Sequence, residues 1–430
     1  MFSLRRSAAA GYRDNFTTAL QWQAARTSVN LGAQPFAEFV KICDRHREDI
    51  PTSIRTALAF RTKQAEHQRK AHARLVSKLG LKALSEDEIF AAFENLATTI
   101  YLPRLSQAYP DVGNWRAKQA DKRLPRHPML VEELSKLARV IPAGENAIIR
   151  DSETRELIAV VIRDWCSNPA VVASLNKTVA KGVGLCVSVR KEDTGKIVLV
   201  GYSAGSRSRP YFDWSRNVRS KKHTAEFLQN YNMTVSSAFA LMWNMMRARL
   251  PKELLADLDE YLAVNNLCRM DGNRTMKASA DGCGEYFVEK GDTVITFAHE
   301  KLAPPGAVMG ANYARAIHSE AQPHKFAYSW TTGRNTDLGG SFYVASHGIK
   351  IEQAANTFIA WQPRLAHGTS MLACDPHLME PPFAQQGMSI VSSMRLATTW
   401  KRYMDGLISA EQAAKEYADS LEDGVEDGSK

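Results

Sequence analysis

The sequence lacks the features that mark a membrane protein, a disulfide scaffold or a repeat protein. No apolar run approaches the ~20 residues that a membrane helix needs. The N-terminus, MFSLRRSAAAGYRDNF, is basic but has no long apolar stretch after it, so it does not read as a secretory signal. The 6 cysteines are spread over 430 residues without a C-x-x-C pair, which favours reduced thiols in an intracellular protein. No internal repeat and no low-complexity segment is visible.

The composition is that of a globular chain with an excess of positive charge. Hydrophobic residues are 44% and charged residues 23%, which allows one large domain or two of ordinary size. The net charge of +9 is uneven: residues 1–78 hold 14 Lys and Arg against 6 Asp and Glu, whereas acids dominate the last residues. A basic body with an acidic tail suits a polyanionic ligand such as nucleic acid. The alternative is that the basic helices are only solvated faces.

Hydrophobic periodicity predicts a basic helical N-terminal region over residues 1–140. Helices are expected at 34–82, 86–108 and 129–140. The segment 61–74, RTKQAEHQRKAHAR, is polar nearly all round and is therefore predicted to be a surface helix.

From about residue 147 the period changes to that of strands, which predicts a β-rich domain over 141–400. The runs AIIRD, ELIAVVIRDW, GLCVSVR and KIVLVGYS are short and β-branched, and KEDTG links the last two like a hairpin. Amphipathic helices at 220–247 and 251–265 form an insertion, 220–265, in this domain.

After Asn266 the chain reads almost entirely as strands and loops. The eight strand candidates are EYFVE, TVITFAH, ARAIHSE, KFAYSWTT, GGSFYVAS, GIKIE, NTFIAWQ and GMSIVSSMR. Eight short strands in one block suggest a double-sheet jelly roll, so the predicted fold is α+β with a double-stranded β-helix, or cupin-like, core. A C-terminal region, 401–430, adds a helix at 401–418 and an acidic tail, 420–430, that we expect to be disordered.

The run ARAIHSE contains a candidate pair of metal ligands, His318 and Glu320. Residues two apart on a strand point to the same face, so both side chains can reach one ion. A later His, His367, follows the apolar run NTFIAWQPRLA. Two imidazoles and one carboxylate form the facial triad of non-heme Fe(II) oxygenases, which leaves positions open for cosubstrate and oxygen. The alternative is a set of satisfied polar residues in an ordinary β-sandwich.

The block from Asn312 to Met371 resembles the core of the fungal Tet-like dioxygenases found in mushrooms. The shared pattern is H-x-D, a spacer, Gly-Gly, a strand and a distal His, and it extends more loosely over 220–400. The resemblance implies a double-stranded β-helix, Fe(II), 2-oxoglutarate and oxidation of methyl groups on DNA bases, including 5-methylcytosine and N6-methyladenine. It further implies DNA as the partner, a base flipped out of the duplex and a nuclear location. Because no apolar run is long enough for a membrane helix, no membrane partner is expected. The sequence leaves the oligomeric state open, and we favour a monomer.

Two departures from the family pattern concern the metal and the cosubstrate. Glu320 stands where the family has Asp; it is one methylene longer and still a hard oxygen ligand. The family places an Arg or Lys past the distal His to grip 2-oxoglutarate, and here that region holds Ser389, with Arg395 six residues on. If the strand continues, Arg395 shares its face, and its planar guanidinium suits a carboxylate. The alternative for Arg395 is a solvated strand end. By resemblance, Asn312 and Tyr313 are candidate cosubstrate contacts as well.

A basic–aromatic run at 207–223, RSRPYFDWSRNVRSKKH, is the candidate nucleic-acid contact. Cations neutralise phosphates, and an aromatic side chain such as Trp214 can stack on a base. The alternative is a loop whose aromatics anchor it to the core. The candidate phosphate contacts are Arg207, Arg209, Arg216, Arg219, Lys221 and Lys222.

Asp337 is the one acid in TTGRNTDLGG, beside the expected metal site. Its carboxylate can accept a hydrogen bond from the amine of N6-methyladenine. The alternative is that Asp337 only serves the turn before Gly339 and Gly340. The sequence leaves open two rivals to a DNA oxygenase. One is a 2-oxoglutarate oxygenase acting on RNA, protein or a small molecule, and the other is a catalytically inactive DNA-binding relative.

Overall fold

The structure is a computed structural model of the 430-residue chain, and it divides into two units, Met1–Leu75 and Val76–Lys430. It describes residues 66–67, 70–82, 84–110, 133–190, 193–205, 210–215, 217–218, 223–273, 281–335, 339–370, 372–373 and 382–408. In the first unit the described residues are helical, whereas the second unit holds all the sheets discussed below. In the part of the chain that is described, no helix is both long enough and apolar enough to span a membrane.

The second unit is an α+β structure. Its helices are α4 (Glu86–Glu94), α5 (Pro169–Leu185), α6 (Ala225–Arg249), α7 (Lys252–Val264) and α8 (Leu396–Met404). Its strands are β1 (Thr99–Leu102), β2 (Arg139–Ile141), β3 (Ala147–Asp151), β4 (Leu157–Ile162), β5 (Thr194–Gly205), β6 (Pro210–Trp214), β7 (Cys283–Lys290), β8 (Thr293–Lys301), β9 (Gly306–Ala314), β10 (Ala327–Arg334), β11 (Phe342–Val344), β12 (Ile349–Ile351), β13 (Thr357–Trp361), β14 (His367–Thr369) and β15 (Gln385–Ile390).

The strands form one large sheet, one small sheet and a separate hairpin. The large sheet has the order β1-β3-β4-β13-β10-β15-β9-β5-β6, and the small sheet has the order β14-β11-β12-β2. Neighbouring strands are antiparallel except for the pairs β1–β3 and β2–β12, which are parallel. Both parallel pairs use strands from the predicted helical N-terminal region, which therefore contributes an edge to each sheet.

Apolar side chains of the two sheets share one core. Ile149 and Ile359 come from the large sheet, and Val344 and Ile351 come from the small one, and all of them are buried in a single cluster. The strand β4, LIAVVI, lies inside the large sheet and is buried along its whole length. A strand buried on both faces loses the alternation of apolar and polar residues, which explains its continuous apolar run.

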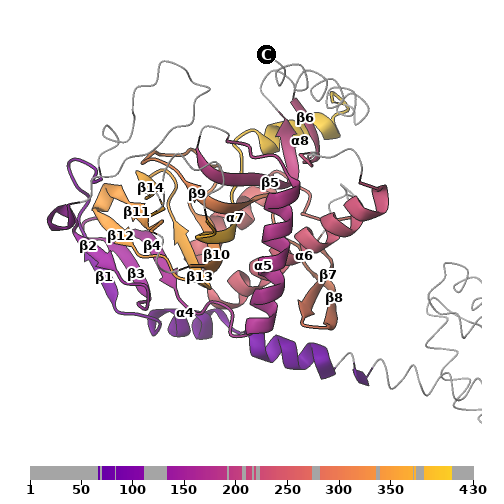
Figure 1. Ribbon diagram of the computed structural model, residues 1–430, viewed down its shortest axis with the longest axis horizontal. Coiled ribbons are helices and arrows are strands. Elements are labelled where there is room, and N and C mark those ends of the chain that lie inside the picture. The colour runs from indigo at the N-terminus through magenta and orange to yellow at the C-terminus, as the bar shows by residue number, and fades with distance from the viewer. Residues whose placement is uncertain are drawn as a thin grey trace, which may run out of the picture. The chain divides into compact units, whose positions relative to one another are not determined.

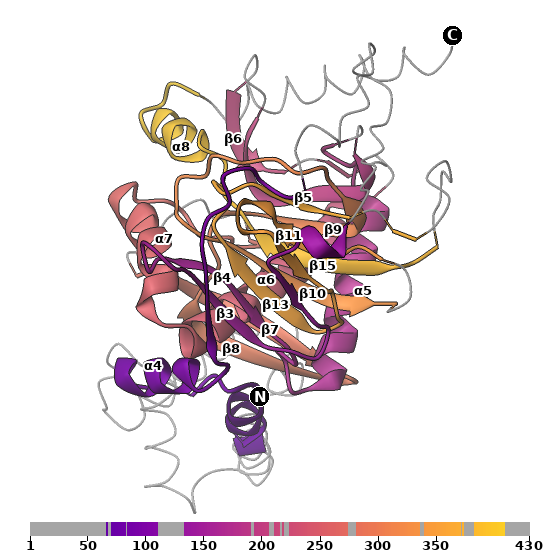
Figure 2. The same cartoon turned by 90° about the vertical axis from the view of Figure 1, so that its left-hand side faces the viewer.

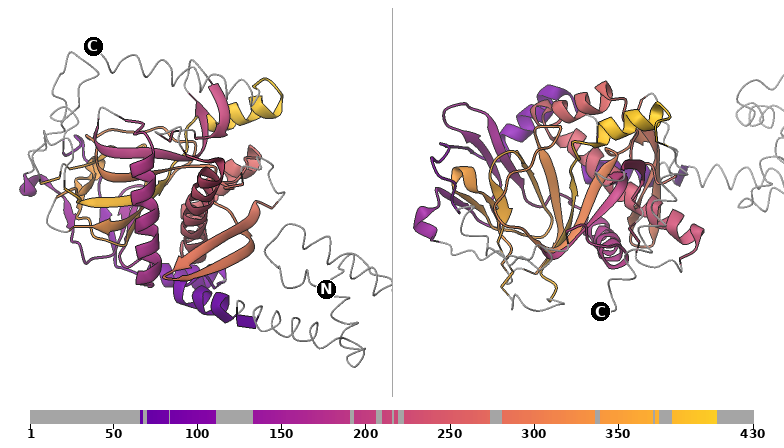
Figure 3. Two further views of the ribbon diagram at one scale, coloured as in Figure 1. Left: turned by 45° about the vertical axis from the view of Figure 1, so that its right-hand side comes forward. Right: turned by 90° about the horizontal axis from the view of Figure 1, so that it is seen from above.

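The helices cover the large sheet on the side away from the small sheet. Figure 1 shows α5 upright beside β10, with α6 behind it. The helix α5 contacts both β10 and β15. The helix α4 packs on α6, and α8 lies against β6 (Figure 2). The hairpin β7–β8 lies along α6 and apart from both sheets (Figure 3, left).

The expected strand GLCVSVR and its hairpin are wrong, because helix α5 continues through Leu185. Asn168 caps the helix by accepting from the backbone N–H groups of Ala170 and Val171, and Pro169 occupies the first turn. Val171, Leu175, Val179 and Val183 are buried, and their spacing of four residues places them on one face of the helix. Beyond the helix, the N–H of Val189 donates to the carbonyl oxygen of Ile197 at 2.9 Å. This backbone bond is what remains of the expected hairpin.

Two predicted helices are also wrong in part. The helix expected at 86–108 stops at Glu94, and residues 99–102 pair with β3 instead. Of the helix expected at 129–140, residues 134–136 form one 3-10 turn and residues 139–141 pair with β12. Pairing with a distant strand determines the conformation of such short apolar segments more strongly than their own propensity does. Most of the expected helix 34–82 and half of the segment 61–74 lie outside the described residues, and the tail 420–430 lies wholly outside them. The described half of the segment, residues 66–67 and 70–74, is helical as expected.

Candidate metal centre

His318 and His367 face each other across a single antiparallel backbone pair. Each N–H donates to the other residue's carbonyl oxygen at 2.9 Å. Directly opposed residues in such a pair carry their side chains on the same face. The two imidazole rings consequently lie 4.4 Å apart between centroids. His367 begins β14, whereas His318 lies in the irregular segment that follows β9, so the expected strand ARAIHSE does not form.

Backbone carbonyls fix the orientation and the tautomer of both rings. Nδ1 of His318 lies 2.7 Å from the carbonyl oxygen of Ala316, and Nδ1 of His367 lies 2.8 Å from that of Leu365. A carbonyl oxygen can only accept, so each Nδ1 must carry the proton. The lone pair is then on Nε2, which is the arrangement that metal-binding histidines use.

Glu320 completes the group. Its N–H donates to the carbonyl oxygen of Pro363 at 2.8 Å, which holds its backbone beside the segment that leads to His367. Its Oε1 lies 3.4 Å from Nε2 of His318. Although the expected strand is absent, the same-face placement of His318 and Glu320 is thus achieved by hydrogen bonds to a neighbouring segment.

Electrostatics keep the carboxylate charged and the buried imidazole neutral. Burial alone would raise the pKa of Glu320, but the adjacent imidazole of His318 and the charge of Arg315 outweigh it and hold this pKa at about 2. Burial, reinforced by the nearby His318, lowers the pKa of His367 to about 4. At neutral pH both groups therefore have the protonation state that a metal ligand requires.

The three side chains fit one metal ion. One nitrogen from each His and one oxygen of Glu320 all lie within 4.8 Å of one another. Two neutral imidazoles and one carboxylate are the donor set of the facial triad, which suits Fe(II). The aromatic rings of Trp361 and Phe342 lie 5.8 and 6.0 Å from the ring of His367, and they give the centre an apolar wall.

Two arginines that the sequence did not single out also converge on Glu320. Arg315 donates to Oε1 of Glu320, and Arg190 lies 3.5 Å from the same atom. Arg315 also lies 3.7 Å from a carboxylate oxygen of Asp193, which accepts from the hydroxyl of Tyr313 at 2.8 Å. No periodicity could have predicted this network, because it depends on the irregular turn between β9 and His318. Its only sequence signal is the position of Arg315 three residues before that His.

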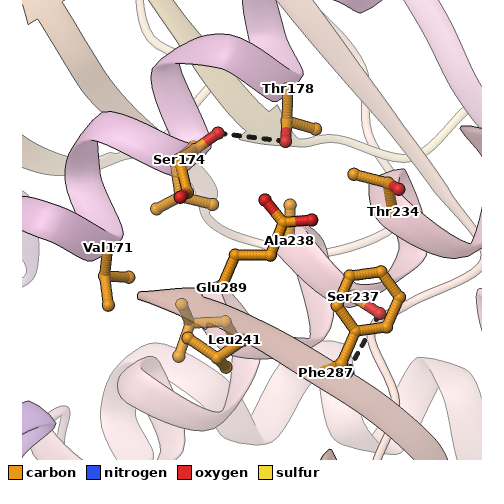
Figure 4. A pocket seen from close by; sticks show the side chains of 11 residues that line it. Val171, Ser174, Thr178, Thr234, Ser237, Ala238, Leu241, Phe287 and Glu289 are labelled. Atoms are coloured by element: carbon orange, nitrogen blue, oxygen red, sulfur yellow. Dashed lines mark hydrogen bonds between the residues drawn. The ribbon is translucent and has the colours of Figure 1, made fainter. Parts of the chain in front are cut away.

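The metal centre lines a cavity of about 770 Å³ between the two sheets. Ile197, Leu199 and Val308 contribute an apolar wall, whereas Ser329 and Gln386 contribute polar atoms. This volume lies in the range usual for small-molecule sites. A second hollow, between α5, α6 and β7 and lined by Ser174, Thr178 and Glu289 among others, measures only about 20 Å³ (Figure 4). It has room for about one water molecule and is no candidate substrate site.

The four candidate cosubstrate residues, Asn312, Tyr313, Ser389 and Arg395, all line the larger cavity beside the metal centre. Ser389 lies on β15 opposite Ser329. The strand ends at Ile390, so the expectation that Arg395 continues the same strand face is wrong. Arg395 instead begins α8 and donates to the carbonyl oxygens of Gly205 and Ala204 at 2.9 and 3.1 Å.

Asn312 and Tyr313 are engaged with the protein itself. The side-chain oxygen of Asn312 accepts from the N–H groups of Ala384 and Gln385, and its amide donates to Pro382. These bonds tie the end of β9 to the start of β15. Burial, followed by the charge of Asp193, raises the pKa of Tyr313, so its hydroxyl stays protonated as a donor.

Within the basic–aromatic run, the aromatics anchor the chain. Trp214 is 5% exposed and packs edge-on against Tyr202, and Phe212 is buried between Tyr202 and Trp400. In this position Trp214 cannot stack on a base, so that expectation is wrong. The six cations of the run, Arg207, Arg209, Arg216, Arg219, Lys221 and Lys222, lie outside the described residues, as does Asp337.

Comparisons with known proteins find no likeness in sequence and only remote likeness in structure. No family model matches the sequence, and no curated protein matches it, so the resemblance to the mushroom enzymes has no support from sequence comparison. Among solved structures, NgTET1 in complex with 5mC DNA is similar at a TM-score of 0.35 and 9% identity, over 61% of this chain and 84% of that one. A likeness this remote carries no inference, and the chemistry has to follow from the side chains.

Proposed function

We propose that the two sheets are the halves of a double-stranded β-helix. The order β9-β15-β10-β13 in the large sheet and the order His318 segment-β14-β11-β12 in the small one support this assignment. From β9 onward the chain passes between the sheets in the alternation that a jelly roll requires. The remaining strands extend this core at its edges.

We propose further that the protein is an Fe(II)- and 2-oxoglutarate-dependent dioxygenase. The observation that carries the proposal is the convergence of His318, Glu320 and His367, with both Nδ1 atoms held by carbonyls and both Nε2 atoms left to bind a metal. When bound, the iron and its cosubstrate supply the oxidising chemistry, and the protein supplies position and electrostatics.

The side chains around the metal centre would bind and orient the cosubstrate and shield the centre from water. Arg315 and Arg190 place positive charge beside Glu320, and this charge would attract an anionic cosubstrate. A planar guanidinium suits a carboxylate, so these two arginines join Arg395 and Ser389 as candidate anchors. Trp361 and Phe342 keep water away from one side of the His367 ring.

As substrate we propose a methylated base in DNA, N6-methyladenine or 5-methylcytosine. The net charge of +9 and a cavity of about 770 Å³ beside the metal centre support it, as does the family resemblance of the motif. A base in a duplex must leave the stack to reach such a site, which costs a few kcal/mol. A DNA substrate also leads us to propose a nuclear location.

An oxygenase for RNA, protein or a small molecule fits the same cavity, and so does an inactive DNA-binding relative. We would incubate the protein with Fe(II), 2-oxoglutarate and methylated duplex or single-stranded DNA, and analyse the bases by mass spectrometry. Loss of the methylated base in wild type, but not in His367→Ala, supports the proposal. Succinate formation without any change in the DNA would redirect it to another substrate, and neither product would leave only a binding role.

A further inference from the structure

A second group of metal-ligand side chains precedes the first in the chain, at the open end of the β7–β8 hairpin. Asp281 comes just before β7, Cys283 begins β7, and His299 lies near the end of β8. The imidazole nitrogen, the thiol sulfur and the carboxylate oxygen of these residues all lie within 4.8 Å of one another. Among the described residues, this group and the His318 centre are the two in which at least three such ligands meet.

Backbone features at this point aim the side chains at one another. The register of the hairpin shifts between Gly284 and Tyr286, where residues 298 and 299 of β8 stand opposite the single residue Glu285, so His299 lies in a β-bulge. His299 itself has φ of +57°, a left-handed conformation that is unfavourable for a residue with a side chain. Bulges often redirect a side chain near a functional site, and a retained left-handed residue suggests that the redirection serves a purpose.

The carboxylate of Asp281 is already fixed in place. Its Oδ1 accepts from the N–H of Cys283 at 2.9 Å, and its Oδ2 lies 3.1 Å from Nε2 of His299. Two ligand atoms on one tetrahedral zinc ion lie roughly 3.3 Å apart, given bonds of about 2.0 Å. The spacing therefore suits either a direct hydrogen bond or two ligands of one ion, and the thiol beside them favours the ion.

We propose that Asp281, Cys283 and His299 form a second metal site, suited to Zn²⁺ and distinct from the His318 centre. A thiolate is a soft ligand that zinc accepts readily, whereas the His318 centre offers only nitrogen and oxygen. Three protein ligands leave the fourth position of the tetrahedron open to water. All three side chains are at least partly exposed, so the ion can enter from solvent.

The site would fasten the open end of the hairpin. The hairpin is held to α6 by Asn244, which donates to the carbonyl oxygen of Lys301 at 2.8 Å, and by Ser237, which accepts from the N–H of Phe287 at 3.1 Å. An ion joining the segment before β7 to β8 adds a cross-link beside the first of these contacts. Zinc should therefore raise the thermal midpoint of the full chain, because the ion binds the hairpin when it is folded and not when it is unfolded.

Cobalt(II) is the probe, because a thiolate bound to it gives a charge-transfer band in the near ultraviolet. The full chain is freed of metal with a chelator and titrated with Co²⁺. The His318 centre has no thiolate, so it cannot produce this band. We expect the band to reach its full intensity at one Co²⁺ per chain and to disappear when Zn²⁺ displaces the cobalt. The band should be unchanged in Glu320→Ala.

Single substitutions assign the ligands. Cys283→Ser should abolish the band, and Asp281→Asn and His299→Gln should each weaken cobalt binding at least about tenfold, as expected for loss of a ligand. Cys374→Ser and Cys43→Ser are the matched controls and should keep the band. Each variant is compared with wild type by circular dichroism in the presence of chelator.

Several results would overturn the site. One is the absence of a thiolate band in folded wild type. Another is a band that survives Cys283→Ser or disappears in one of the control cysteine variants. A third is wild-type affinity in both Asp281→Asn and His299→Gln, because binding would then reflect an exposed thiol alone. The iron centre is untouched by any of these outcomes.

Discussion

Replacing Glu320 with Gln should destabilise the metal-free protein in a way that depends on pH. The change keeps the length of the side chain and its ability to accept from Arg315, but it removes the charge. The pKa of Glu320 is about 2 in the fold, against an ordinary value of 4.5. If the pKa is lowered by this much, the charge of Glu320 contributes at most about 3 kcal/mol to the free energy of unfolding. The side chain is 30% exposed, so solvent screening reduces our expectation to about 1–2 kcal/mol.

The sign of the pH dependence follows from the direction of the shift. Because the folded pKa lies below the unfolded one, the charge stabilises the fold fully above about pH 4.5. The contribution is then lost as the pH falls from there toward 2. Urea unfolding of wild type and Glu320→Gln, with chelator present, should show the full difference at pH 7 and a progressively smaller one below pH 4.5. Glu285→Gln, at an exposed position on β7, is the control.

A difference that stays constant across this pH range would show that the effect of the substitution comes from packing and not from charge. No difference at pH 7 would refute the reasoning, since the carboxylate would then gain nothing from His318 and Arg315 in the fold.

Four further predictions test other parts of the account. His318→Ala and His367→Ala should each abolish turnover and iron binding while circular dichroism stays unchanged; full activity with unchanged iron content in either variant would remove that residue from the centre. Replacing the four Arg and Lys residues between 216 and 222 with Ala should weaken DNA binding and lower its log–log salt slope by roughly one unit per lost phosphate contact; an unaltered slope would point to the helix 61–74 instead. Asp337→Phe should shift kcat/KM from N6-methyladenine toward 5-methylcytosine by roughly ten- to a hundredfold, as for loss of one hydrogen bond to a charged acceptor; an unchanged ratio would leave Asp337 with its turn role. Chelator should stop turnover and Fe(II) should restore it, whereas recovery with Zn²⁺ alone would argue against redox chemistry.

The sequence was most informative where periodicity and length were strong. The helices α6 and α7 and the strands β3, β4, β5 and β13 lie close to their expected positions, because each carries a long amphipathic face or a dense β-branched run. The expected strand GMSIVSSMR starts in β15, but it ends at Ile390 and not at Arg395.

Elements that depend on distant partners could not be found in this way. The strand β9, GAVMGANYA, is rich in small residues and carries no β-branched run, yet it pairs with both β15 and β5. The strands β1, β2 and β14 have three or four residues each, too few to show a period. Their conformation is determined by the sheet to which they add.

The candidate metal centre was predictable as a set of residues but not as a geometry. His318, Glu320 and His367 were found from spacing and chain order, and the structure brings them together. The reason given for the first two, a shared strand face, is wrong, since hydrogen bonds to His367 and Pro363 place them. The contact of Arg315 with Glu320 could not be predicted, because it depends on the irregular conformation of that segment.

The most direct test of the central claim is 2-oxoglutarate turnover by the metal-free protein reloaded with Fe(II) in air, without any nucleic acid. Succinate is quantified by mass spectrometry, and bound iron is measured in the same samples. The proposal predicts succinate formation that requires Fe(II) and is lost, together with one bound iron per chain, in Glu320→Ala and in His367→Ala. Succinate at the level of these two variants in iron-loaded wild type, or wild-type iron content in both of them, would contradict it.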